Sequence, residues 1–148
     1  MGLLADTAKK TGLDTEKQAA DDTLIALAMG CMAFADGAMD QGEVASIEAF
    51  ASTLPEFANG CFAEPWNASG KIFNKYEGDV KKCVEELKGL SSPVLKQKAF
   101  ILAVDIALAS GDVDSAEDEL LDLMKTTLEI DDTFAQHVTS VLASKYAQ

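Results

Sequence analysis

The 148-residue sequence predicts a single all-α domain, a helical bundle of about seven helices built from two duplicated helix–turn–helix units. Three observations carry this prediction. Apolar residues recur every three or four positions in most segments, and no segment shows the alternation of a half-buried strand. Two long, almost uncharged runs each precede a glycine turn and an amphipathic segment. The two turns lie 74 positions apart, and the apolar residues around them keep that offset.

The duplication is clearest in the turns themselves. Residues 34–43 read FADGAMDQGE, and residues 108–117 read LASGDVDSAE. The glycine, aspartate and glutamate positions match in pairs: Gly37 with Gly111, Asp40 with Asp114, and Glu43 with Glu117. We therefore expect equivalent units at about 25–54 and 99–128, with the first helix of each unit in the centre of the fold.

The helices are expected in a simple order after an arm, residues 1–12, with one short helical stretch. The expected ranges are about 15–35, 40–54, 68–77, 79–89, 93–110, 114–128 and 131–146. The helices at 15–35 and 93–110 contain segments that are apolar on every side, which is typical of central helices. Proline cannot continue a helix, so Pro55 closes one, while Ser92-Pro93 is a strong start signal for another. Residues 55–67, with two prolines, a glycine and Trp66, are expected to form a packed connection.

The charge of the chain limits its partners. With 25 acidic and 12 basic residues the formal net charge is −13, which repels nucleic acid phosphates and anionic membranes and attracts cations or basic protein surfaces. The longest uncharged run, residues 23–35, is too short to span a bilayer, and no signal peptide is evident. Three widely spaced cysteines form no disulfide framework, and Cys31 is expected in the core. We expect a cytoplasmic protein with protein partners, no nucleic acid and no direct membrane insertion.

The candidate site is acidic. Asp-x-x-Glu at a helix start is first of all a capping box, in which each carboxylate satisfies a backbone N–H of the first turn. The two turns carry more acid than a cap needs, and oxygen ligands at short spacing suit Ca²⁺, Mg²⁺ or Zn²⁺. The predicted metal ligands are Asp36, Asp40, Glu43, Asp105, Asp112, Asp114 and Glu117. An EF-hand is excluded, because the glutamate needed at position 12 is Ile47 or Leu123.

Asp105 is the exception in its apolar helix. A buried carboxylate must be paired or hydrogen-bonded, so we expect either a hydroxyl, lysine or cap partner, or a place in the metal site. His137 is expected to be a surface or core residue and not a ligand. No Ser/His/Asp, Cys/His or phosphate-loop arrangement is present in the sequence, so a non-enzymatic role is predicted and a carboxylate-dependent hydrolase is disfavoured.

The twice-written pattern Ala-x-Ala-Asp/Ser-Gly-x-x-Asp-x-x-Glu, followed by an apolar helix, resembles the tellurite-resistance TerB-like family over roughly residues 20–145. The resemblance implies an all-helical duplicated bundle, a divalent metal site and a role in tellurite and other stress resistance alongside partner proteins. It implies no enzymatic activity. The motif falls on Asp36, Gly37, Asp40, Glu43, Gly111, Asp114 and Glu117, with Ser110 in place of the first copy's aspartate. The alternative is a protein–protein adaptor whose acidic turns are only caps and hold no metal.

Overall fold

The computed structural model describes residues 15–35, 41–58, 61–109, 111 and 113–148. Most of these residues are helical and none of them forms a strand, which confirms the all-α class. The elements of this part are α2 (Thr15–Ala33), α3 (Gln41–Ala51), η1 (Pro55–Phe57), α4 (Ala63–Lys75), α5 (Val80–Glu86), η2 (Leu87–Gly89), α6 (Pro93–Ala109), α7 (Ser115–Thr127) and α8 (Asp132–Lys145), where η marks a short 3-10 helix. The short helical stretch predicted within residues 1–12 lies outside the described residues.

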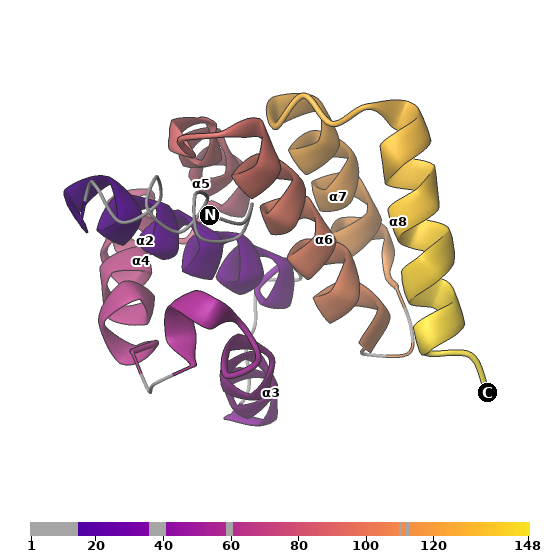
Figure 1. Cartoon of the computed structure of the whole chain (residues 1–148), viewed down its shortest axis with the longest axis horizontal. Coiled ribbons are helices and arrows are strands. Elements are labelled where there is room, and N and C mark those ends of the chain that lie inside the picture. The colour runs from indigo at the N-terminus through magenta and orange to yellow at the C-terminus, as the bar shows by residue number, and fades with distance from the viewer. Residues whose placement is uncertain (1–14, 36–40, 59–60, 110, 112) are drawn as a thin grey trace, which may run out of the picture.

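The helices α2 and α6 pack against each other at the centre of the fold (Figure 1). α4 covers another side of α2, whereas α7 and α8 pack on α6. The largest fully buried side chains of α2 are Ile25, Leu27, Met29 and Met32, and Cys31 is buried with them. Burying one such side chain contributes about 1.5–3 kcal/mol. The predicted central positions of these two apolar helices are therefore confirmed.

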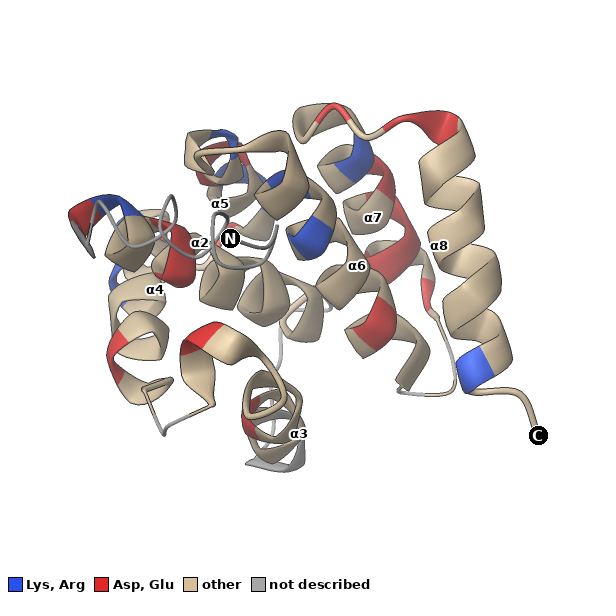
Figure 2. Ribbon diagram, in the orientation of Figure 1, with Lys and Arg blue, Asp and Glu red and all other residues tan. Residues whose placement is uncertain are grey.

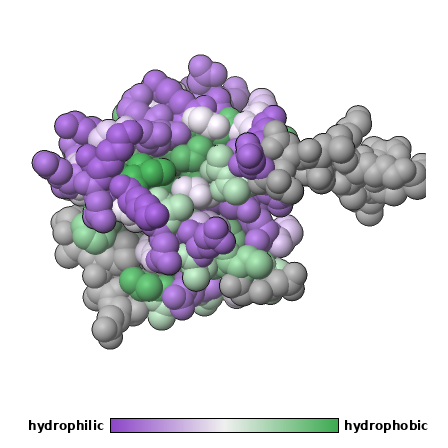
Figure 3. Space-filling view, turned by 90° about the vertical axis from the view of Figure 1, so that its left-hand side faces the viewer, coloured by the Kyte–Doolittle hydropathy of each residue, from purple (hydrophilic) through white to green (hydrophobic). Residues whose placement is uncertain are grey.

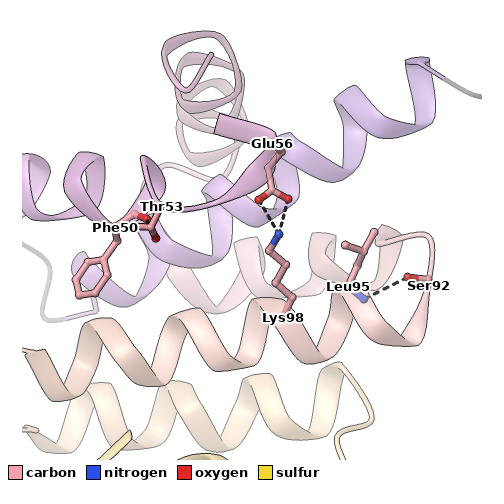
Figure 4. Close-up of polar contacts among 6 residues, drawn as sticks. All are labelled: Phe50, Thr53, Glu56, Ser92, Leu95 and Lys98. Atoms are coloured by element: carbon pink, nitrogen blue, oxygen red, sulfur yellow. Dashed lines mark hydrogen bonds and ion pairs between the residues drawn. The ribbon is translucent and has the colours of Figure 1, made fainter. Parts of the chain in front are cut away.

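Side-chain caps set several of the helix boundaries. Gly78, with a positive φ of 79°, closes the turn after α4, and the Asp79 carboxylate accepts hydrogen bonds from the first turn of α5. Ser92 Oγ accepts a hydrogen bond from the Leu95 N–H at 3.2 Å, as the Ser-Pro start signal predicts (Figure 4). Asp131 caps α8 in the same way. Along the described chain, no helix combines the length and apolar character that crossing a membrane needs.

The structure corrects the prediction that residues 55–67 form a connection between two helices. α4 begins at Ala63, five residues earlier than the expected start at 68, so Trp66 is helical. The prediction is wrong because a proline is also compatible with the first turn of a helix. In the structure Pro65 is the third residue of the helix, where its missing N–H costs no intrahelical hydrogen bond. Earlier in the same range, η1 at Pro55–Phe57 forms one short helical turn.

Candidate functional site

The second acidic turn caps α7. Asp114 Oδ1 accepts a hydrogen bond from the Glu117 backbone N–H at 2.8 Å, and the Glu117 carboxylate accepts one from the Asp114 N–H at 3.3 Å. Gly111, with φ at 85°, supplies the left-handed residue of the turn. Both carboxylates lie at the positive end of the helix dipole. The capping role proposed for these two residues is confirmed.

The first acidic turn lies largely outside the described residues. This applies to Asp36 and Asp40, to the side chain of Glu43, and also to Asp112 of the second turn. Among the residues that the structure describes, no group of three or more His, Cys, Asp or Glu side chains is placed to hold a metal ion. The convergence of the two turns on one cation therefore stays a prediction.

Asp105 is buried and has partners. The residue is 8% exposed, and its two carboxylate oxygens accept hydrogen bonds from Lys145 Nζ at 3.1 and 3.0 Å. The Tyr146 hydroxyl donates to Oδ1 at 2.5 Å. The carboxylate raises the pKa of Lys145, whose ammonium also lies 5.3 Å from the centre of the Phe50 ring in α3. The expected lysine and hydroxyl partners are confirmed, and the pair joins the centre of the fold to the end of α8.

A partly buried acidic cluster of Asp21, Asp22 and Glu56 connects α2 and η1 with Ser91 and Lys98, which lie just before and within α6. Asp21 is buried and accepts hydrogen bonds from the Ser91 N–H at 2.9 Å and from the Ser91 hydroxyl at 2.5 Å. Lys98 Nζ donates to both oxygens of Glu56, at 2.6 and 2.5 Å (Figure 4). Burial, and then the charges of Glu56 and Asp21, raise the pKa of Asp22 to about 6.

Sequence reasoning missed this cluster. Its one signal was the adjacent pair Asp21-Asp22 at the edge of an apolar segment. The partners lie 70 residues away for Asp21–Ser91 and 42 residues apart for Glu56–Lys98, so no local spacing could identify them. We interpret the cluster as a structural network. Its shortest contacts join α2 to the segment before α6 and η1 to α6, and the side chains of Glu56 and Lys98 are largely buried.

A groove of about 810 Å³ lies over α6, between α7 and α8. Phe100, Val104 and Leu121 are among the residues of its apolar floor. Its rim is polar and includes Asp118 and Asp122, one helical turn apart on α7. Figure 2 shows how acidic residues recur along α7 and in the connection to α8.

The rim of this groove is negative overall. Its lysine, Lys125, forms an ion pair with Asp132 at 2.7 Å, and that carboxylate raises the pKa of Lys125. Asp118 and Asp122 make no ion pair with any described residue. A cation brought by a binding partner would therefore meet carboxylates that are not already neutralised.

No protein-family model, curated protein or solved structure matches this chain. A function must therefore be inferred from the groove over α6 and from the acidic residues of the chain.

Proposed function

We propose that this chain is a non-enzymatic acidic module that binds other proteins through the groove between α7 and α8. The observation that carries the proposal is the combination of an apolar floor with an acidic rim. A helix-binding groove needs apolar surface to bury and polar groups at its edge to set orientation. The partner that fits is an amphipathic helix with an apolar face and flanking lysine or arginine residues.

The geometry suits a helix as the occupant. α7 and α8 both pack on α6, and the groove between them offers a site where a further helix can pack on the bundle. The excess of negative charge on the rim, in a chain at −13, favours a basic partner and disfavours an acidic one. Electrostatic attraction would also increase the rate of association at low salt.

A stress-response role of the TerB-like type is the biological setting of this proposal. It rests on the repeated acidic turn, of which Asp114 and Glu117 form the described part. The order of elements is compatible with two duplicated units, 25–54 and 99–128, because α2 is followed by α3 in the first range and α6 by α7 in the second. We expect these two units to superpose, with Ile47 and Leu121 in equivalent positions.

A divalent-metal site is the second candidate function. The observation that favours it is in the sequence: Asp36, Asp40 and Glu43 place three carboxylates within eight residues. Two observations reduce its support in the second turn, where Asp114 and Glu117 cap α7 and Asp105 is held by Lys145. A metal site would therefore depend mainly on the first turn.

Fluorescence anisotropy of a labelled helical peptide tests the protein-binding proposal. The probe is an amphipathic peptide of leucine and lysine, about five helical turns long, and its control has glutamate at the lysine positions. We expect saturable binding of the lysine peptide and none of the glutamate peptide. The double variant Asp118→Asn/Asp122→Asn should weaken binding about tenfold, because it removes the two unpaired charges of the rim.

The matched control is Glu48→Gln/Glu64→Gln, which changes the net charge equally on exposed positions of α3 and α4. It should change the affinity less than twofold at about 0.15 M salt, where distant charges are screened. If both double variants weaken peptide binding equally, the affinity depends on the net charge of the chain and not on the groove, and the proposal is refuted. A shift in affinity with added Ca²⁺, Mg²⁺ or Zn²⁺ would instead favour the metal candidate.

A further inference from the structure

A hollow lies between α2 and α4, and none of its lining residues lines the groove over α6. Its volume is about 400 Å³, within the range of small-molecule sites. Leu27 and Gly30 of α2 and Phe34, directly after that helix, line it on one side. On the other side α4 contributes Trp66 and Phe73, which helical spacing places on one face. Figure 3 looks onto the α4 side of the molecule, where hydrophilic residues surround smaller apolar areas.

Two glycines shape the hollow. A side chain at Gly30 would place its Cβ 3.3 Å from the Trp66 ring, so the indole occupies the space that this glycine leaves. At Gly70 a Cβ would meet no atom within 4 Å, so the space beside that glycine is open. One glycine thus accommodates the tryptophan and the other helps to keep the hollow empty.

The walls of the hollow are aromatic. The rings of Phe34 and Phe73 meet edge to face with centroids 4.8 Å apart, and Trp66 lies on the same lining. The Ser69 hydroxyl donates to the Trp66 carbonyl at 2.7 Å, so it is used within the helix. Such surfaces favour a flat apolar ring, since aromatic pairs attract each other beyond the effect of their buried area.

The mouth of the hollow carries a cation. Lys71 lines it next to Asn67 and Asn74, and no described carboxylate forms an ion pair with Lys71. Other lysines of the chain, such as Lys98 and Lys145, are paired with acids. An unpaired ammonium beside aromatic walls selects an anionic ligand despite the negative charge of the whole chain.

We propose that the hollow between α2 and α4 binds a small planar aromatic carboxylate, with its ring against Trp66 and Phe73 and its carboxylate at Lys71. The volume excludes the helix of a protein partner but accommodates a one-ring or two-ring ligand. This inference is independent of the protein-binding groove, with which it shares no lining residue.

Fluorescence offers a direct test, because Trp66 is the one tryptophan of the chain. The probes are 4-nitrobenzoate and its uncharged isostere 4-nitrobenzamide, both of which quench indole emission on contact. We expect saturable quenching by 4-nitrobenzoate and about fivefold weaker binding of the amide, the size of effect that one partly exposed ion pair gives. Lys71→Met should abolish this preference, whereas Lys82→Met, an equal charge change on α5, should preserve it.

Filling the hollow is the second arm of the test. Gly70→Leu should remove saturable quenching by both probes, with helicity measured by circular dichroism to show that the variant is folded. Because Lys71 is exposed, we expect Lys71→Met to fold, and the comparison of the two probes then tests the proposal even if Gly70→Leu does not fold. Quenching that rises linearly with probe concentration, is equal for the two probes and is unchanged by Lys71→Met would overturn the proposal.

Discussion

Removing the ammonium of Lys145 should leave the Asp105 carboxylate buried without a counter-charge. Lys145→Met keeps most of the aliphatic stem but loses both hydrogen bonds to Asp105, so that among the described residues the Tyr146 hydroxyl remains as the partner of the carboxylate. Breaking a fully buried pair in this way costs about 3–5 kcal/mol. Because the Lys145 side chain is 49% exposed, water can replace part of the lost interaction, and we expect a loss of about 1–2 kcal/mol.

Chemical and thermal unfolding measure this loss. For a chain of this length, 1 kcal/mol corresponds to a midpoint shift of about 2–4 °C. The double variant Asp105→Asn/Lys145→Met should recover most of the stability, because the uncompensated charge is gone and the amide can still accept from Tyr146. The matched control is Lys125→Met, which breaks an ion pair with the exposed Asp132 and should cost clearly less than Lys145→Met, because water screens an exposed pair.

Two results would refute this reasoning. One is a cost of Lys145→Met no greater than that of Lys125→Met, which would mean that Asp105 does not need its counter-charge. The other is a double variant whose instability equals the sum of the two single variants. In that case the two side chains would act independently of each other.

Three further predictions concern the pH dependence of stability, two glycine substitutions and the binding of a metal ion. Since the pKa of Asp22 is raised to about 6, the folded state binds more protons than the unfolded state between about pH 4 and 6. Stability should therefore fall as the pH rises through 6, by about 1 kcal/mol after allowance for solvent screening, and urea unfolding of Asp22→Asn should show no such loss. Gly70→Ala should raise the free energy of unfolding by about 0.5–1 kcal/mol, because the added methyl enters open space within a helix. Gly111→Ala should lower it by about 1–2 kcal/mol, because its φ is positive. A metal bound only to the folded state should stabilise it by about 2.7 kcal/mol at 100 times its dissociation constant. Thermal unfolding of chelator-treated protein with Ca²⁺, Mg²⁺, Mn²⁺ and Zn²⁺ should show a gain that Glu43→Gln/Glu117→Gln reduces, and an equal gain in that variant would leave the turns as caps alone.

Sequence reasoning succeeded where the information is local. The apolar periodicity located the central helix α2, and Ser92-Pro93 marked the start of α6 to the residue. The capping box at Asp114 and Glu117 follows from a spacing of three residues, which one helical turn fixes. The weakest boundary was the start of α4, where Pro65 is compatible with both a break and a first helical turn.

The candidate sites were harder to predict because they depend on distant partners. The burial of Asp105 could be inferred from its apolar neighbours, but its lysine lies 40 residues away. The groove over α6 and the hollow beside α4 arise from how three helices and two helices, respectively, come together. Nothing in the spacing of Gly70 and Trp66 shows that one leaves space and the other fills it.

The central position of α2 has a consequence for the synthesis of the chain. From Leu24 onward this helix is apolar on every side, and it is covered by α4 and α6, both of which follow it in the sequence. At about 5–20 residues per second, a ribosome needs roughly 4–15 s to advance from the end of α2 to the end of α6. Until α6 is complete, the face of α2 that packs on α6 stays uncovered in the nascent chain, which makes this apolar segment the one that a chaperone would bind during translation.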